Sequence, residues 1–472
     1  MLFPTIEYAV LFLLAFALAW STTKHSFAHR LLLLALSWCF YAWGSLTHLP
    51  LLLAISLSAT WFARRVQASP DPRRRQRWLF VGCAAPLVVL AIFKYAAFAV
   101  NNTSELLHYF GAEATWVAPD IVLPIGISFF VFHAISLVVD VYRGNVKAPV
   151  RWLDGALYLS FFPQLVAGPV VRASDFLPQL SAPPTRDLIE RDRAIGLVVV
   201  GLFKKVVLAS HLGILLSDPV FDAPAEFGGA RVLVAIYAYA GQIYCDFSGY
   251  TDMAIGSALL LGYRFKDNFA APYAATSIQE FWRRWHISLS SFLRDYLFIP
   301  LGGSHLGEWR TRRNLLVTML LGGLWHGAGW NFILWGAMHG SAQVIHRAWS
   351  KSPAPWIAKI RKHPLWPIAA WLLTFHTVCL GWVFFRAANF AQALEVLRAL
   401  TRAGTAVPWQ AWLLVAVGVL AQVLPWGRWT PSIHKWVARL PSPAIGAAAA
   451  LAVLVIDALG PIGVPPFIYF QF

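Results

Sequence analysis

Charge is scarce in this sequence. Only 13% of its 472 residues are charged, whereas 58% are hydrophobic, and the mean hydropathy is +0.59. A soluble globule of this size needs more polar surface than that. The chain also lacks a Gly/Ser-rich or Pro-rich stretch that could link separate domains. We therefore expect one integral membrane domain over residues 1–472 with an all-α fold, because a helix satisfies its own backbone hydrogen bonds in lipid.

Cysteine is also rare, which argues against a small protein held together by disulfides or by zinc. The four cysteines lie in apolar stretches and show no paired spacing: Cys39, Cys83, Cys245 and Cys379. This pattern predicts neither a disulfide framework nor a zinc site, and no metal is expected. Buried free thiols that act as small apolar side chains are the simplest interpretation, and a cysteine nucleophile is a weak hypothesis.

Long apolar stretches run almost from end to end. About 20 apolar residues are needed to cross the hydrocarbon core as a helix. The stretches predict about eleven crossings, with 229–262 and 313–347 long enough to be either a tilted helix or a broken pair. The predicted spans are 5–20, 28–46, 50–63, 78–99, 121–141, 195–216, 229–262, 313–347, 364–386, 409–424 and 443–460.

The basic residues alternate between loops. They follow the first, third and fifth predicted spans, whereas the loops at 47–49 and 100–120 have none. This positive-inside pattern places the N-terminus outside, and it explains much of the +16 net charge as topology and lipid headgroup contact. Nucleic-acid binding is not indicated, because the basic residues do not gather on one soluble face. The first span has no basic residue before it, so we expect it to be retained rather than cleaved.

The most regular local pattern is "IQEFWRRWHISLSSFLRDY" at residues 278–296. Its large apolar residues recur at steps of three and four, which predicts one helix with an apolar stripe. Such a helix should lie in the membrane interface, with arginines toward water or phosphate. His286 falls at the border of the stripe, where it could turn toward the protein interior, and the run 300–303 should end the helix.

Polar side chains are concentrated in the otherwise apolar stretch 229–262. Gln242 and Asp246 are among them, and ionisable groups at such depth face a polar cavity or a partner. Two interpretations remain open at this point. Asp246 either pairs with a nearby cation such as Lys204 or Lys205, or it lines a reaction cavity.

A histidine, His326, lies at the centre of "LGGLWHGAGWNFILWGAMHG", residues 321–340. In a water-poor interior a neutral histidine can act as a general base, provided that a second group holds its tautomer. The surrounding glycines would let a substrate approach the backbone closely. On a continuous helix His339 would face elsewhere, so it could support His326 only if the glycines break the helix.

Five ordered motifs resemble those of the membrane-bound O-acyltransferases, within the bacterial branch that contains alginate O-acetyltransferase and the D-alanyl transfer protein of teichoic acid synthesis. They fall within residues 120–390. The motifs are "FFPQLVAGPVVR" (161–172), "YCDFSGYTDMAIGSALLLGYRFKDNFAAPY" (244–273), "FWRRWHISLSSFLRDYLFIPLGG" (281–303), "LGGLWHGAGWNFILWGAMHG" (321–340) and "GWVFFRA" (381–387).

The resemblance implies roles for individual residues. The family's membrane-embedded histidine corresponds to His326, which makes it the expected catalytic base. Many eukaryotic members have an asparagine at the place of His286. His286 is expected either to orient His326 or to contact substrate. His376 matches a further histidine of the bacterial members. Substrate or tunnel contacts are expected from the neighbours and polar residues of these sites: Trp325, Trp285, Asn331, Asp246, Gln242 and His376.

The resemblance also implies a reaction. Helices would surround a thin central core, with a cytoplasmic opening and an outward funnel. A cytosolic acetyl thioester, acetyl-CoA, would serve as the donor substrate, with no permanently bound cofactor. A hydroxyl of an exported polysaccharide would attack the thioester while His326 takes its proton, and backbone N–H groups or Asn331 would stabilise the oxyanion.

The implied setting is the bacterial inner membrane, with lipid around the chain and a separate periplasmic or membrane-anchored acetyltransferase as partner. Three alternatives stay open. They are transfer of D-alanine or another acyl group, a transporter or export channel, and a structural scaffold for a polysaccharide secretion complex.

Overall fold

The computed structural model describes residues 3–111, 116–185, 190–420, 422, 437, 439–463 and 465–468, and every regular element in these ranges is a helix. The chain divides into two compact units. One holds Met1–Val198 and Thr251–Lys266, and the other holds Val199–Tyr250 and Asp267–Phe472. The single domain expected from the sequence stays a prediction, since the long helix α12 (Gly229–Leu260) contributes to both units.

The first unit is built around α3. This helix contacts α4, α5 and α6, while α2 packs on both α1 and α6. Arg30 of α2 reaches Asp154 of α6 at 2.6 Å, so the one strongly buried cation in this contact is paired with an anion. The helices of the unit are α1 (Ile6–Ser21), α2 (Ser26–Ser45), α3 (Leu49–Ala68), α4 (Pro72–Tyr109), α5 (Ile127–Tyr142), α6 (Trp152–Ser160), α7 (Phe162–Leu165) and α8 (Ala173–Phe176).

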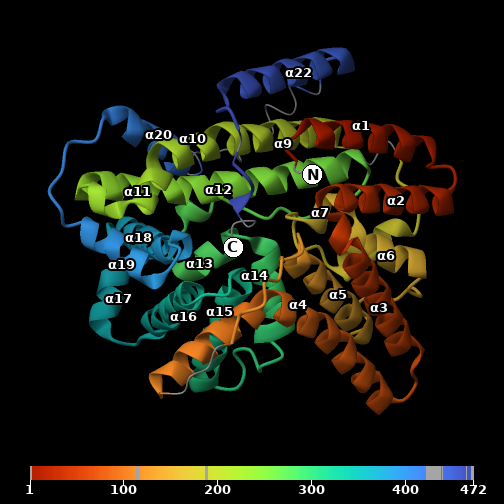
Figure 1. The fold of residues 1–472 in the computed structure, drawn as a ribbon, viewed down its shortest axis with the longest axis horizontal. Coiled ribbons are helices and arrows are strands. Elements are labelled where there is room, and N and C mark those ends of the chain that lie inside the picture. The colour runs from red at the N-terminus through yellow and green to blue at the C-terminus, as the bar shows by residue number, and fades with distance from the viewer. Residues whose placement is uncertain are drawn as a thin grey trace. The chain divides into compact units, whose positions relative to one another are not determined.

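The second unit contains most of the remaining helices, which Figure 1 labels. α9 (Arg191–Phe203) belongs to both units and continues through two π-helical segments, Lys204–Ala209 and Gly213–Ser217, with α10 (Ser210–Leu212) between them. The others are α11 (Asp218–Asp222), α13 (Ile278–Arg284), α14 (Ile287–Leu293), α15 (Glu308–His326), α16 (Trp330–Lys351), α17 (Pro355–Lys362), α18 (Trp366–Arg386), α19 (Phe390–Ala399), α20 (Trp409–Leu420) and α22 (Ser442–Leu459).

The stretch 313–347 is a broken pair and not one tilted helix. α15 and α16 form a hairpin that packs on α13 and α18 (Figure 1). The backbones approach so closely that a Cβ on Gly336 would lie 2.4 Å from the carbonyl oxygen of Met319, and one on Gly323 would lie 2.3 Å from that of Phe332. Close approach of this kind is how helices pack tightly in a membrane. By contrast, the other long stretch, 229–262, is the single helix α12.

Ion pairs connect the start of α15 to the end of α16. Glu308 at the start of α15 accepts hydrogen bonds from Arg347 and Lys351 near the end of α16, at 2.6 to 3.0 Å. These bonds lower the pKa of Glu308 to about 2. The ion pairs fix the register at one end of the hairpin, and the glycine contacts fix it along the interface.

Five helical segments are long and apolar enough to cross a membrane. They are Ser26–Ala68, Pro72–Tyr109, Arg191–Asp222, Trp366–Arg386 and Ser442–Leu459, and α1, α5 and α20 are shorter apolar helices. α12, α15 and α16 are long enough but do not reach the same apolar content. The expected number of about eleven crossings is therefore not confirmed, and the end of the predicted span 409–424 lies largely outside the described residues.

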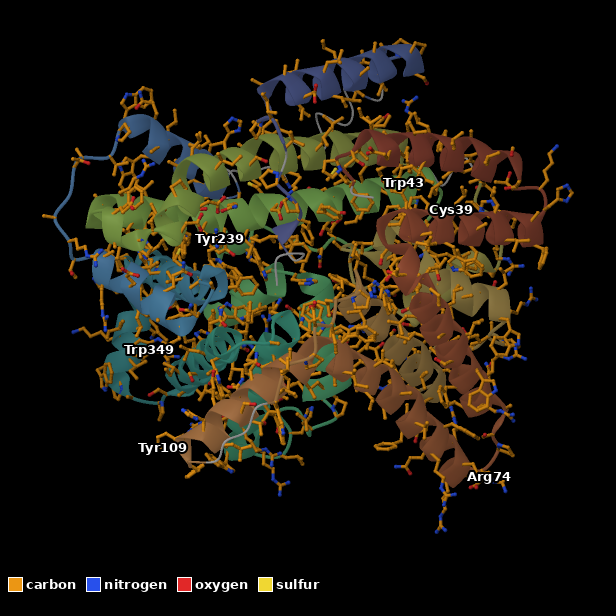
Figure 2. The ribbon with its side chains drawn as sticks, viewed as in Figure 1. Cys39, Trp43, Arg74, Tyr109, Tyr239 and Trp349 are labelled. Carbon is orange, nitrogen blue, oxygen red and sulfur yellow. The ribbon has the colours of Figure 1, made fainter. Side chains whose placement is uncertain are left out.

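Large apolar side chains cover much of the outer surface. Trp43 is 69% exposed and Tyr109 is 83% exposed, and Figure 2 labels both. In a chain surrounded by water such a surface would aggregate, whereas lipid tails or headgroups cover it without cost. Arg74 lies at the tip of the α3–α4 hairpin (Figure 2), so the basic loop predicted between these spans does form a hairpin end.

The close α15–α16 packing predicts opposite effects for two helical glycines. Gly336→Ala should lower the free energy of unfolding by about 1–3 kcal/mol, because the new methyl group meets the backbone of α15. Gly446→Ala in α22 has open space around its Cβ and should be neutral or stabilising by up to about 1 kcal/mol. Thermal unfolding of the detergent-purified variants measures both. Equal stability of the two variants would contradict this account of the hairpin.

Candidate functional site

His326 is the last residue of α15, and the chain then runs extended through Gly327. A Cβ at Gly327 would lie 2.1 Å from the ring of Phe332, so only glycine leaves room for this ring at the break. α16 begins at Trp330 and returns along α15. The glycine-rich sequence thus turns the chain back and leaves the imidazole of His326 at the end of the hairpin.

Aromatic rings enclose His326. Its ring centroid lies 4.9 Å from Trp325, 5.0 Å from Trp335 and 5.3 Å from Phe385 of α18. The side chain is 5% exposed. The imidazole is therefore largely buried among aromatic rings, and the expected passage to it stays a prediction. The cavity described below does not include His326.

The helix break also changes the position of His339. On one continuous helix His339 would face away from His326, but the hairpin brings Trp335 between them. Trp335 lies 5.0 Å from His326 and 4.7 Å from His339. His339 is buried, and among the described residues neither of its ring nitrogens has a hydrogen-bond partner. The glycines thus meet the condition under which His339 could belong to the same cluster.

The predicted helix over 278–296 is wrong, because the chain breaks inside it. α13 ends at Arg284, Trp285 is extended, and His286 has the left-handed conformation with φ of 42° before α14 begins at Ile287. Hydrogen bonds from a distant part of the chain hold the break: Ile287 N–H donates to the Asn268 carbonyl at 2.9 Å. Periodicity within the segment contains no signal for such a contact. The run 300–303 does follow the last helical turn, as expected.

His286 is fully buried beside the His326 cluster. Its ring meets Phe247 edge-on at 4.6 Å and lies 6.4 Å from Trp325, which in turn contacts His326. Its Nδ1 lies 3.3 Å from the side-chain oxygen of Asn268. The structure therefore brings the two catalytic candidates together through one tryptophan.

Trp285 packs against other residues than the adjacent His286 does. Its ring stacks on Phe281 at 5.6 Å and contacts Trp382 at 5.0 Å and Phe269 at 5.1 Å, and it is 1% exposed. These contacts make Trp285 part of the packing between α13 and α18. Trp325, in contrast, contacts both histidines.

Asn331 and His376 lie in positions that do not favour their predicted roles. The Asn331 amide nitrogen donates to the carbonyls of Phe384 and Ala387 at 3.3 and 2.9 Å, so it ties the start of α16 to the end of α18. The exposed His376 bonds Tyr237 and the Leu372 carbonyl, each at 2.7 Å. His376 is not among the rings around His326. Oxyanion and substrate contacts by these residues stay predictions.

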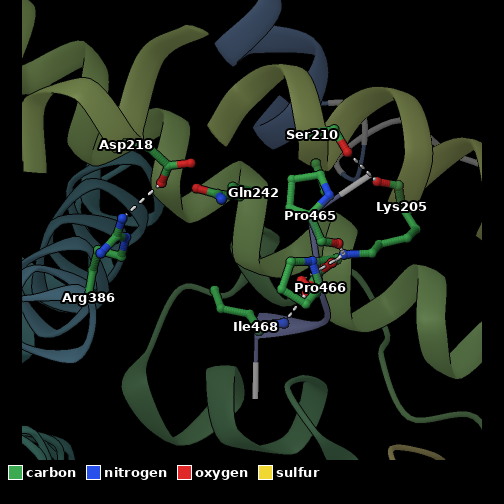
Figure 3. A pocket seen from close by; sticks show the side chains of 10 residues that line it. Lys205, Ser210, Asp218, Gln242, Arg386, Pro465, Pro466 and Ile468 are labelled. Carbon is green, nitrogen blue, oxygen red and sulfur yellow. Dashed lines mark hydrogen bonds and ion pairs between the residues drawn. The ribbon is translucent and has the colours of Figure 1, made fainter. Parts of the chain in front are cut away.

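Gln242 and Asp246 line a polar cavity of about 70 Å³ (Figure 3). This volume is large enough to hold water. Asp246 forms a buried ion pair with Lys205 of the first π-helical segment. The pairing expected from the sequence is therefore confirmed, and Asp246 also lines a cavity, whose part in a reaction stays a prediction. The other lining residues are Ala209, Ser210, Asp218, Arg386, Pro465, Pro466 and Ile468.

The Lys205–Asp246 pair also holds the segment 465–468. Lys205 donates to the carbonyls of Pro465 and Pro466 at 2.9 and 3.2 Å, and the Ile468 N–H donates to Asp246 at 2.9 Å. Figure 3 shows Lys205 beside Pro465 and Pro466, with Ile468 nearby. The pair is thus satisfied by backbone groups on both sides, as a buried ion pair requires.

Three features escaped prediction from the sequence. Asn268 contacts His286 and lies in the motif 244–273, which could have drawn attention to it. Phe385 and Arg386 lie in the motif 381–387, which could have drawn attention to them. Phe385 contacts His326, whereas Arg386 pairs with Asp218 at 3.0 Å in the cavity wall. Among the residues that the structure describes, no group of three or more His, Cys, Asp or Glu side chains could hold a metal ion.

Comparisons with known proteins agree with the motifs. Residues 109–384 match the model of the membrane-bound O-acyltransferase family. The probable alginate O-acetylase of Pseudomonas aeruginosa is 41% identical over 411 residues, which cover 87% of this chain and 76% of that protein. The probable alginate O-acetylase of Azotobacter vinelandii is 44% identical over 372 residues (79% and 72%). The peptidoglycan O-acetyltransferase of Helicobacter pylori is 37% identical over 401 residues (79% and 74%).

The ion pair in the cavity predicts that a single substitution lowers the unfolding free energy much more than substitution of both partners. Asp246→Leu leaves the Lys205 ammonium buried without its anion and should cost about 3–5 kcal/mol of unfolding free energy. Lys205→Met combined with Asp246→Leu should recover most of that loss. The exposed pair Lys266–Asp175 provides the control, since Lys266→Met should cost at most about 1 kcal/mol. Thermal or denaturant unfolding in detergent measures these values, and a double variant as unstable as Asp246→Leu would refute the pairing.

Proposed function

Because this chain belongs to the membrane-bound O-acyltransferase family, we propose that it transfers an acetyl group from a thioester to a hydroxyl group of a cell-envelope polysaccharide. The relatives support the choice of acyl group, since they are named as O-acetylases or O-acetyltransferases of alginate and peptidoglycan. The chain is accordingly an acyltransferase and a multi-pass membrane protein.

The observation that carries the proposal is the position of His326 at the break between α15 and α16. A neutral imidazole has a nitrogen lone pair that can take up a proton, and burial among aromatic rings makes the charged form of a histidine costly. The surrounding rings of Trp325, Trp335 and Phe385 exclude water. Exclusion of water protects a thioester from hydrolysis while the alcohol attacks.

The reaction balances with His326 as the proton carrier. The acceptor oxygen attacks the thioester carbonyl as its proton moves to the imidazole. Collapse of the tetrahedral intermediate breaks the C–S bond, and the proton then passes from the imidazolium to the thiolate. The products are the O-acetyl ester and the free thiol, and the imidazole returns to its neutral state.

Access to His326 requires movement of the ring cluster, because the side chain is 5% exposed. Phe385 is the ring that we expect to move. It contacts His326 and precedes Arg386, whose side chain lies in the wall of the polar cavity. A polar substrate in the cavity would displace the end of α18 and with it Phe385. The structure thus supports a route in which substrate binding opens the site.

The setting of the reaction follows from the chemistry of its substrates. Acetyl-CoA is the donor that we propose, and it is too polar to cross a bilayer unaided, whereas an exported polysaccharide lies on the other side. We place the chain in the bacterial inner membrane, where it joins the two compartments. A separate periplasmic or membrane-anchored acetyltransferase would then receive the acetyl group or complete the transfer.

Substitution of His326 tests the proposal. In membranes supplied with radiolabelled acetyl-CoA and candidate polysaccharides, His326→Ala and His326→Gln should reduce ester formation by about 100-fold to 10,000-fold, the usual contribution of a general base. His346→Gln is the matched control, because His346 lies on α16, bonds Ser350 near the surface and should retain full activity. Protein amounts are measured in each membrane preparation.

Other outcomes would identify a different function. Full acetylation by His326→Gln would contradict the role as base, and equal acetylation with and without the chain would leave only a scaffold or transport role. Labelling by a D-alanyl thioester but not by acetyl-CoA would overturn the choice of acyl group while keeping acyl transfer.

A further inference from the structure

Asn268 makes three contacts at the break between α13 and α14. Its carbonyl accepts the N–H of Ile287 at 2.9 Å, and its side-chain oxygen accepts the N–H of Ser288 at 3.0 Å. The same side-chain oxygen lies 3.3 Å from Nδ1 of His286. One buried asparagine therefore caps the first turn of α14 from outside the helix and also touches the histidine that precedes it.

These contacts fix which way the amide of Asn268 points. A backbone N–H can only donate, so the group that faces Ser288 N–H must be the oxygen and not the NH₂ group. An oxygen at 3.3 Å from His286 Nδ1 is attractive only when Nδ1 carries the hydrogen. In the neutral imidazole the other nitrogen, Nε2, then holds the lone pair. The Asn268 contact at 3.3 Å therefore favours the tautomer with hydrogen on Nδ1, and the Ser288 hydroxyl at 3.5 Å can accept from the same N–H.

We propose that Asn268 is a positioning residue of the acyl-transfer site, which holds His286 with Nε2 as a hydrogen-bond acceptor for a second hydroxyl of the polysaccharide, next to the hydroxyl that loses its proton to His326. This inference rests on the function proposed above, in which His326 takes the proton. Nε2 is buried and has no hydrogen-bond partner among the residues that the structure describes. A buried acceptor without a partner is costly, and a substrate hydroxyl would satisfy it.

The backbone supports the same role. His286 is one of two non-glycine residues with positive φ among the described residues, and this conformation is unfavourable for a side chain with a Cβ. The two hydrogen bonds from Ile287 and Ser288 to Asn268 hold the strained residue in place. Removal of the asparagine side chain would therefore release both the orientation of the ring and its tautomer.

The described contacts of the His286 ring are with uncharged side chains. They come from Phe247, Trp325, Asn268 and Ser288. His326 lies beyond Trp325 in this series of ring contacts. A carboxylate introduced at position 268 would place an anion next to Nδ1, so the pH profile reports on this contact.

Two substitutions separate positioning from stability. Asn268→Ala removes the acceptor and should lower kcat/KM for the polysaccharide by about 10-fold to 100-fold, while KM for the acetyl thioester stays within about twofold. Asn268→Asp keeps an oxygen for Ser288 N–H but favours the imidazolium form of His286. The acidic limb of its pH–rate profile should therefore move to higher pH, with partial recovery of activity at alkaline pH.

Two further variants complete the experiment. Asn314→Ala is the matched control, because Asn314 is a buried asparagine that bonds the backbone carbonyls of Leu301 and Gly303. It should lower stability without shifting the pH profile or the polysaccharide kcat/KM. If Asn268 acts through His286, Asn268→Ala combined with His286→Ala should be no less active than His286→Ala alone.

Each result has a definite meaning. Unchanged kcat/KM per folded Asn268→Ala protein, an unmoved acidic limb in Asn268→Asp, or additive losses in the double variant would overturn the proposal. Loss of acetyl transfer in none of the His326 variants would instead defeat the proposed function itself, whatever the Asn268 variants show.

Discussion

Close contact between the backbones of α15 and α16 is the constraint on which the site depends. Carbonyl oxygens of one helix occupy the space that side chains on Gly323 and Gly336 would fill, and the ring of Phe332 fills the space at Gly327. This packing lets a hairpin form in place of one long helix. As a result, His326 at the end of α15 and His339 within α16 both contact the ring of Trp335.

The sequence predicts this site in part. Motif and spacing identify His326 and His286, and the composition gives a helical membrane protein. They do not show that 278–296 breaks at His286, because the cause is a pair of hydrogen bonds to Asn268, 19 and 20 residues earlier in the chain. Nor does spacing place His339, since the turn at Gly327 depends on how Phe332 packs. Local patterns predict helices well, but hydrogen bonds and packing between distant residues decide where the helices break.

Polar residues of the second unit fall into two sets with different chemistry. One set surrounds the cavity and contains the ion pairs Lys205–Asp246 and Arg386–Asp218. The other set consists of imidazoles held between aromatic rings, with His286 and His326 joined by Trp325. The end of α18 contributes to both sets through two successive residues, Phe385 and Arg386. The ion pairs of the cavity thus lie on residues other than those that contact the imidazoles.

This separation matters for a reaction that begins and ends with neutral histidines. A charged group beside His286 or His326 would favour one protonation state permanently, and an imidazole that stays protonated cannot accept a proton from an alcohol. Asn268 solves the problem of orientation without adding charge, because an amide oxygen can fix a tautomer while leaving the imidazole neutral. An aspartate in the same place would hold the ring equally well but would stabilise the imidazolium. An amide at this position therefore lets a histidine in a water-poor site stay neutral and accept a hydrogen bond.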